Sequence, residues 1–217
     1  MIRADISHLH PEGAVKLFAA VVATILTLLS PPHVGAQACD VELVVLGIAQ
    51  DAGKPQLGHP KDPAWQDPSL ARLAASIALV DTRFDTPRRW IFDATPDVKV
   101  QLQRLDEAYP TSAYVGVDGI FLTHAHMGHY TGLVHLGHEA ARTDKLPVYA
   151  MPRMTGFLES NGPWDQLVNH ENIAITTMMD QEAVELAPGV NVTPFIVPHR
   201  DEYSETVGFI IEGPEKS

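Results

Sequence analysis

Short apolar runs alternate with polar, turn-forming stretches from residue 41 to the end of the chain. Val41–Ile48 (VELVVLGI) is continuous enough to predict a buried first strand. Ser76–Val80 and Trp90–Phe92 predict a pair of strands with a turn near Thr86-Pro87. Further strands are predicted at Gly119–Leu122, Pro147–Ala150, Ile173–Ile175, Val190–Val197 and Val207–Ile211.

Helical segments lie between these strands. Thr95-Pro96 is typical of a helix start, with Thr as the N-cap and Pro at the first helical position, and this helix should end near Tyr109. A second helix is predicted from about Tyr130 to Ala140, and a short third helix over Pro152–Ser160. Because strands outnumber helices and the two interleave, the pattern favours an α/β fold with mixed sheets and helices outside them.

Residues 51–68 interrupt this pattern. They contain four prolines and two glycines and predict a long irregular loop. Loops of this length inside a compact domain are more often functional than idle.

The first forty residues predict a targeting segment and no part of the fold. Leu17–Leu29 is an apolar run of thirteen residues, too short to span a bilayer but suited to the core of a signal peptide. We expect a signal peptide over residues 1–38, cleaved after Ala38, so that Cys39 begins the mature chain. A lipid on Cys39 is the alternative. The expected location is therefore outside the cytoplasm, periplasmic or secreted.

Composition limits the partners of residues 39–217, which form a single predicted domain. The formal net charge is −12, which argues against nucleic acid or an anionic membrane surface as the partner. Cys39 is the only cysteine, so an internal disulfide is excluded. We expect a small-molecule substrate, no nucleic acid and no stable membrane anchor, and the sequence leaves the oligomeric state open.

The chemistry is concentrated in the segment that follows the strand Gly119–Leu122. His124, His126 and His129 lie within six residues there, and His199 follows the later strand Val190–Val197. Neutral imidazoles are common zinc ligands, and ligands at i and i+2 after a strand can converge on one ion. A polar loop that happens to be rich in histidine is the alternative. Three imidazoles with one open position would form a catalytic zinc site.

This sequence resembles the metallo-β-lactamase superfamily, whose signature is an HxHxDH loop after a strand and a later histidine after another strand. Within it, the chain is similar to the pyrroloquinoline quinone biosynthesis protein B branch. The similarity to this branch rests on Leu46–Gly53 (LGIAQDAG), Phe92–Asp97 (FDATPD) and Leu122–Leu133 (LTHAHMGHYTGL). The resemblance implies a mixed αββα sandwich with metal at one edge between the sheets. It assigns His124, His126 and His199 to the first metal position and His129 to a second.

Two departures from the family pattern change the expected site. Gly128 replaces the aspartate of the motif, which leaves His129 as a single ligand of the second position, so one ion is expected, zinc or alternatively iron. Asp51, Asp93 or Asp201 could supply a carboxylate from a neighbouring loop.

The second departure lies at the end of the printed sequence. The family pattern continues into a strand with a metal-bridging aspartate and then a further histidine, whereas neither residue type follows Glu212. The expected sandwich is therefore C-terminally incomplete, either in a naturally short chain or in a fragment.

Three functions are compatible with these observations. The first is an exported metal-dependent hydrolase in which water is activated at the three-histidine site. The second is an iron-dependent oxygenase or a carrier related to quinone-cofactor biosynthesis, and the third is a degenerate, non-catalytic metal-binding protein. Asp93, Asp51, Tyr130 and Arg200 are candidates for contacts around the metal or with substrate, and no residue is identified as the catalytic base.

Overall fold

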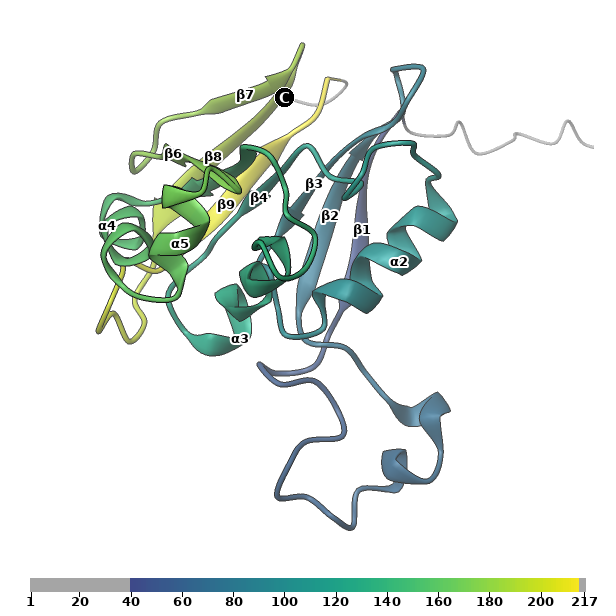
Figure 1. Cartoon of the computed structure of the whole chain (residues 1–217). Coiled ribbons are helices and arrows are strands. Elements are labelled where there is room, and N and C mark those ends of the chain that lie inside the picture. The colour runs from purple at the N-terminus through teal and green to yellow at the C-terminus, as the bar shows by residue number, and fades with distance from the viewer. Residues whose placement is uncertain (1–39, 215–217) are drawn as a thin grey trace, which may run out of the picture. The chain divides into compact units, whose positions relative to one another are not determined.

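Two β-sheets form the centre of the domain, in the computed structural model that describes residues 40–214 (Figure 1). The first sheet has six strands in the spatial order in which they occur along the chain. They are β1 (Val41–Gly47), β2 (Ser76–Asp81), β3 (Arg88–Phe92), β4 (Gly119–Phe121), β5 (Leu146–Ala150) and β6 (Ile173–Thr177). The first three strands pair antiparallel and β3 to β6 pair parallel, so the predicted mixed sheet is confirmed.

The second sheet is smaller and antiparallel. It consists of β7 (Val184–Ala187), β8 (Val190–Ile196) and β9 (Val207–Glu212), with β8 in the middle. Its inner face packs on the first sheet through an apolar cluster that includes Trp90, Phe121 and Val192. Phe121 is fully buried there and stacks on Tyr149, with 4.2 Å between ring centroids.

The helices cover the opposite face of the six-stranded sheet. They are α2 (Val98–Ala108), α3 (Met127–Tyr130), α4 (Pro152–Ser160) and α5 (Trp164–Asn169), together with the 3-10 turn Thr131–Leu136. Two further 3-10 turns, Pro63–Trp65 and Pro68–Leu70, lie in the long loop between β1 and β2, which extends away from the sheets (Figure 1). A second apolar cluster joins them to the sheet through residues such as Leu105, Leu133 and Leu158. Within residues 40–214, no helix covers the outer face of β7–β9, where Phe195 and Ile210 are exposed.

The first strand differs from the prediction of a buried strand. β1 is an edge strand, and Leu43 and Val45 are 56% and 64% exposed. These two residues pair with Leu79 and Ile77 of β2, so they share the face that the smaller sheet covers. Val41 at the start of β1 still packs against the apolar cluster between the sheets, so β7–β9 leave only the later part of this face of β1 uncovered.

Two helix predictions also need correction. The first helix begins at Val98 and not at Pro96, because Thr95 forms a turn in which its hydroxyl accepts from the Asp97 amide at 3.1 Å. The second begins earlier, at Met127, and continues only as a 3-10 turn to Leu136. Gly132 explains this shape, since its amide donates to the Ala94 carbonyl at 2.8 Å and holds the segment against the end of β3.

Several sequence predictions lie outside the described residues. These are the signal peptide of residues 1–38, its cleavage after Ala38 and the role of Cys39. Among residues 40–214, the helices are all too short or too polar to span a bilayer.

Candidate metal site

The candidate site forms at one edge of the large sheet, where three strands deliver polar residues. β3 and β4 run parallel, so Asp93 and His124, which follow them, emerge at the same edge. β1 is antiparallel to β2, which is antiparallel to β3, so β1 also ends there and delivers Asp51. His199 reaches this edge from the second sheet, three residues after the end of β8.

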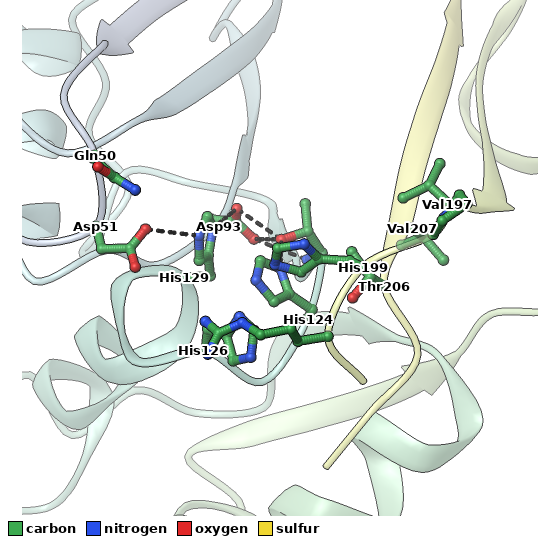
Figure 2. A pocket seen from close by; sticks show the side chains of 13 residues that line it. Gln50, Asp51, Asp93, His124, His126, His129, Val197, His199, Thr206 and Val207 are labelled. Carbon is green, nitrogen blue, oxygen red and sulfur yellow. Dashed lines mark hydrogen bonds and ion pairs between the residues drawn. The ribbon is translucent and has the colours of Figure 1, made fainter. Parts of the chain in front are cut away.

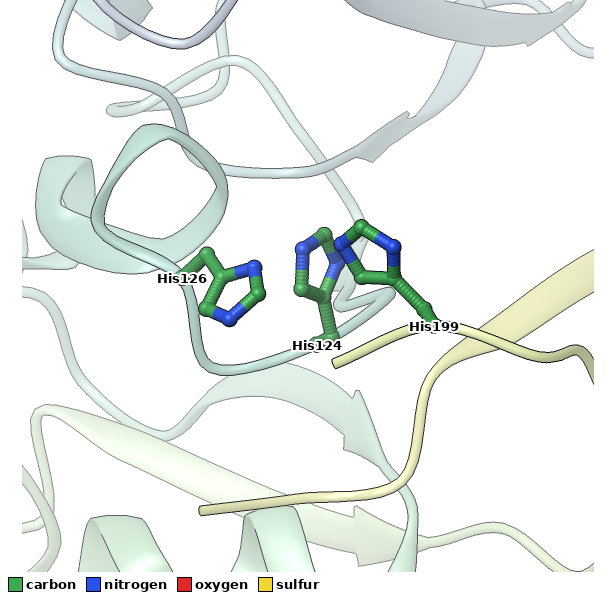
Figure 3. Close-up of side chains that lie close together, drawn as sticks. All are labelled: His124, His126 and His199. Atoms are coloured by element: carbon green, nitrogen blue, oxygen red, sulfur yellow. The ribbon is translucent and has the colours of Figure 1, made fainter. Parts of the chain in front are cut away.

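Three of the predicted histidines converge. One ligand atom each of His124, His126 and His199 lies within 4.8 Å of the others (Figure 3). The His124 ring is 4.6 Å from the His126 ring and 4.9 Å from the His199 ring between centroids, and it is nearly perpendicular to both. This spacing and orientation allow all three imidazoles to face one cation.

A short chain of hydrogen bonds fixes the orientation of His124. The Thr123 hydroxyl lies 3.0 Å from both carboxylate oxygens of Asp93 and 2.8 Å from His124 Nδ1. Since a carboxylate only accepts, the hydroxyl proton goes to Asp93 and the hydroxyl accepts from Nδ1–H of His124. Nε2 of His124 is therefore the nitrogen with a lone pair, available to a cation.

The surroundings of His124 also favour its neutral form. Burial, and after it the nearby imidazoles of His129, His126 and His199, together lower the pKa of His124 from its ordinary 6.5 to about 3. A neutral imidazole is the form that binds a metal ion. In the metal-free protein at neutral pH, His124 thus needs to lose no proton to become a ligand.

Glu202 orients His126 through a hydrogen bond, and the sequence analysis did not identify Glu202 as a site residue. Its carboxylate oxygen Oε2 lies 3.0 Å from His126 Nε2. The carboxylate accepts from this nitrogen, which leaves Nδ1 of His126 with the lone pair. The hydrogen bond from His126 lowers the pKa of Glu202. No spacing rule in the sequence indicates this contact, because it depends on the path of the chain after His199.

Asp93 forms hydrogen bonds with both Thr123 and His129. Besides the bonds from Thr123, its carboxylate accepts from His129 Nδ1 at 2.6 Å (Figure 2). Its backbone has φ of 70°, a left-handed conformation that is uncommon outside glycine. Asp93 thus lies where the sequence predicted it, and its contacts are with residues that hold imidazoles in place.

His129 lies between two carboxylates. Its Nε2 is 3.4 Å from Asp51 Oδ1, on the side opposite Asp93 (Figure 2). Burial alone would lower the pKa of His129, but the hydrogen bond and charge of Asp93 and the charge of Asp51 outweigh it and the pKa is raised. The ring centroid of His129 is 4.1 Å from that of His124, so it belongs to the same cluster of imidazoles.

These residues line an open cavity of about 410 Å³. Its wall is formed by Gln50, Asp51, Asp93, Thr123, His124, His126, His129, Val197, Pro198, His199, Arg200, Thr206 and Val207. The Thr206 hydroxyl is buried there and has no hydrogen-bond partner among the described residues. Sequence reasoning missed Thr206, whose residue type alone gives no signal.

Of the remaining candidates, Arg200 lines the cavity, whereas Tyr130 and Asp201 do not. Arg200 lines the cavity with a largely exposed side chain. Tyr130 does not, which corrects the prediction of a substrate contact, because its ring packs in the core 5.0 Å from Trp164 and 5.4 Å from Phe157. Asp201 is also outside the cavity wall and pairs with Arg153 at 3.3 Å.

The low pKa of His124 predicts how the stability of the metal-free protein depends on pH. Above pH 6.5 the imidazole is neutral in both the folded and the unfolded protein. Between pH 6.5 and about pH 3, His124 binds a proton in the unfolded chain but stays neutral in the folded protein. Stability should therefore fall as the pH drops through this range, by up to about 1.4 kcal/mol per pH unit from this group. Denaturant unfolding of chelator-treated wild type and His124→Gln at several pH values measures the contribution. Parallel curves for the two proteins would contradict it.

Comparison with known proteins agrees with this geometry. A family model described as the β-lactamase superfamily domain matches residues 88–217. A coenzyme PQQ synthesis protein B from Rhodopseudomonas palustris (strain TIE-1) is 26% identical over 169 residues, which cover 73% of this chain and 53% of the relative. The corresponding protein of strain CGA009 is 27% identical over 173 residues, with the same coverage.

Solved structures give the same result. Zinc-bound PqqB from Methylobacterium extorquens superposes with a TM-score of 0.62 at 26% identity, over 79% of this chain and 61% of that one. A diphosphatase of the PhnP family superposes with a TM-score of 0.56 at 24% identity, again over 79% and 61%, and shares the fold. The chain thus spans about half the length of the curated relatives that it matches.

Proposed function

Because the chain belongs to the β-lactamase superfamily, we propose that it is a metal-dependent hydrolase of a small molecule, with His124, His126 and His199 as the ligands of its first metal ion. The observation that carries this proposal is the convergence of three imidazoles on one point in the wall of an open cavity. Hydrogen bonds to carboxylates orient two of these imidazoles. Asp93 holds His124 through the Thr123 hydroxyl, and Glu202 holds His126 directly.

The donor set suits zinc. Three neutral imidazoles in an open cavity form the ligand set of a catalytic zinc site, in which the protein leaves one position open. Zinc held in this way lowers the pKa of a bound water toward neutrality and polarises a carbonyl or phosphoryl oxygen. Imidazoles also bind iron, so iron is the alternative occupant.

The other residues of the cavity wall suit a polar or anionic substrate. Arg200 offers a guanidinium at the rim, and the unpartnered hydroxyl of Thr206 lies in the wall. A buried hydroxyl without a partner is costly, and a substrate oxygen or nitrogen would satisfy it. We propose that Arg200 and Thr206 position the substrate and that the imidazoles hold the metal beside its reacting group.

A second candidate function follows from the relatives. The curated relatives are named coenzyme PQQ synthesis protein B, which favours a role in quinone-cofactor biosynthesis, as an iron-dependent oxygenase or a carrier. We place this second because the chain spans only about half of those proteins. The predicted signal peptide of residues 1–38 also favours a role outside the cytoplasm, and we propose that the chain is exported.

A substrate screen with defined metal content tests the first candidate. Purified protein is stripped with a chelator, reloaded with zinc or, anaerobically, with iron, and assayed against phosphodiesters, thioesters, lactones and β-lactams. We expect turnover of at least one class by the zinc form, its loss on chelation and its recovery with zinc. His199→Ala should abolish this turnover, whereas His138→Ala, an exposed histidine outside the cavity, should retain it.

The outcomes separate the candidates. Turnover that survives His199→Ala would overturn the assignment of the site. A folded, zinc-loaded protein with no turnover in any class would favour the carrier or a non-catalytic metal-binding protein. Oxygen-dependent turnover in the iron form alone would favour the oxygenase.

A further inference from the structure

A second cavity lies on the helix-covered face of the large sheet, between α2 and the 3-10 turn Thr131–Leu136 (Figure 1). Its volume is about 330 Å³, and its wall shares no residue with the wall of the metal cavity. Pockets for small organic molecules have volumes of about 300–1,000 Å³. The cavity is therefore large enough for a small ligand of its own.

Most of the wall of this cavity is apolar and belongs to the core. Val98, Ile120 and Leu136 are buried residues of the cluster that joins the helices to the sheet, and all three line the cavity. Other apolar residues of the wall are Ala94, Leu102, Val115, Ala140 and Ala141. Water in such surroundings finds few hydrogen-bond partners, so the wall favours a ligand with a hydrocarbon body.

Two nitrogen-bearing side chains give part of the wall a positive character. Lys99 enters it from α2 and His135 from the 3-10 turn. Burial, and after it the charge of Lys99, lowers the pKa of His135, so the two side chains are close enough to interact. At neutral pH this leaves one cation and one neutral imidazole that still donates through one ring nitrogen.

The carboxylate of the wall is already engaged by another residue. Asp106 Oδ1 lies 2.7 Å from Nη2 of Arg89, whose side chain is 1% exposed. Asp106 also follows Lys99 by seven positions on α2, which is about 10 Å along a helix axis. Among the described residues of the wall, the charge of Asp106 is thus balanced by Arg89, and the charge of Lys99 is available to an anion.

We propose that this cavity binds a small amphipathic carboxylate, with its hydrocarbon part against Ile120 and Leu136 and its carboxylate between Lys99 and His135. A carboxylate accepts hydrogen bonds from both side chains, and its single charge matches the single cation. The site contains none of the three histidines assigned to the metal. It is a binding site in addition to the proposed function and does not depend on it.

Calorimetric titration of metal-stripped wild type with octanoate and with octanamide tests the proposal. The two probes share a hydrocarbon chain and differ in charge. We expect saturable binding of one molecule per chain, with octanoate bound about 5-fold more tightly, as for a favourable, partly exposed ion pair. Lys99→Gln should reduce the affinity for octanoate to that for octanamide and leave octanamide binding unchanged.

Two further variants serve as controls. Ala141→Trp places an indole in the cavity and should abolish binding of both probes. Arg104→Gln removes a positive charge from an exposed position on the same helix, outside the cavity wall, and should bind both probes as wild type does. Circular dichroism checks the fold of each variant, and octanamide binding by Lys99→Gln shows that its cavity is intact.

The outcomes that contradict the proposal are distinct. Absence of saturable octanoate binding by wild type would overturn the cavity as a ligand site. Equal affinities for octanoate and octanamide would overturn the preference for an anion. Binding that persists in Ala141→Trp would place the ligand elsewhere, the metal cavity included. Because every titration uses metal-stripped protein, none of these results depends on whether the three histidines support hydrolysis.

Discussion

Replacing His124 by alanine is expected to abolish tight zinc binding and to reduce any hydrolytic turnover to background. His124 is the central imidazole, 94% buried, with His126, His129 and His199 all within 5 Å between ring centroids. Two ligands would remain for the first ion. Because changes one shell further out cost about 10–100-fold in metal affinity, the loss of a ligand should cost more than 100-fold.

The measurement is a zinc competition titration of wild type and His124→Ala in parallel with the substrate screen. His138→Ala provides a matched control, since it removes an imidazole of the same kind from an exposed position outside the cavity. Equal losses in the two variants would indicate general destabilisation and contradict a specific role of His124. Zinc bound by His124→Ala at wild-type affinity would place the metal elsewhere.

Replacing Phe121 by alanine should have the largest effect on stability. The ring is fully buried between the two sheets, stacked on Tyr149 at 4.2 Å and on Phe92 at 5.0 Å, with the Phe209 edge at 5.6 Å. Removal of such a side chain costs about 3–5 kcal/mol through lost burial and the cavity that remains. Domains are stable by only about 5–15 kcal/mol, so the variant should be marginally folded.

Denaturant unfolding of the apo protein measures this loss. Phe84→Ala is the matched control, because Phe84 is 38% exposed and contacts Arg88 at 5.6 Å from its ring centroid. We expect that control to lose less than about 1 kcal/mol. A comparable loss in both variants would show that the contact between the sheets contributes little to stability.

The sequence pattern was sufficient for most strands and for the three converging histidines. Runs of β-branched and aromatic residues mark β2 to β6, β8 and β9, and ligands placed directly after strands emerge at a sheet edge. It was insufficient for β7 and α5, which are four and six residues long. Segments this short carry little periodicity, and tertiary packing determines their conformation.

The contacts around the histidines depended on tertiary structure in the same way. Glu202 and Thr206 lie in the loop between β8 and β9 and Asp51 lies in the loop after β1, and no local pattern encodes the paths of these two loops. The sequence named Asp51 only as one of three acidic candidates. The close approach of the Asp51 backbone to Gly128 becomes visible only once β1 and β4 are placed in one sheet.

The position of His199 has a consequence for the way the chain holds together. His124 follows a strand of the large sheet and His199 a strand of the small one. Close to them, the Val207 amide donates to the Thr123 carbonyl at 3.1 Å and joins the two sheets. A cation bound by both histidines would act as a reversible crosslink that closes a long loop of the chain. Unlike a disulfide, such a crosslink is lost when the chain unfolds, so it stabilises by binding the folded state, and ligand at 1,000 times its dissociation constant contributes about 4 kcal/mol. The single cysteine of the chain excludes an internal disulfide. With a cation bound by both histidines, the small sheet would separate from the large sheet only when the cation is released.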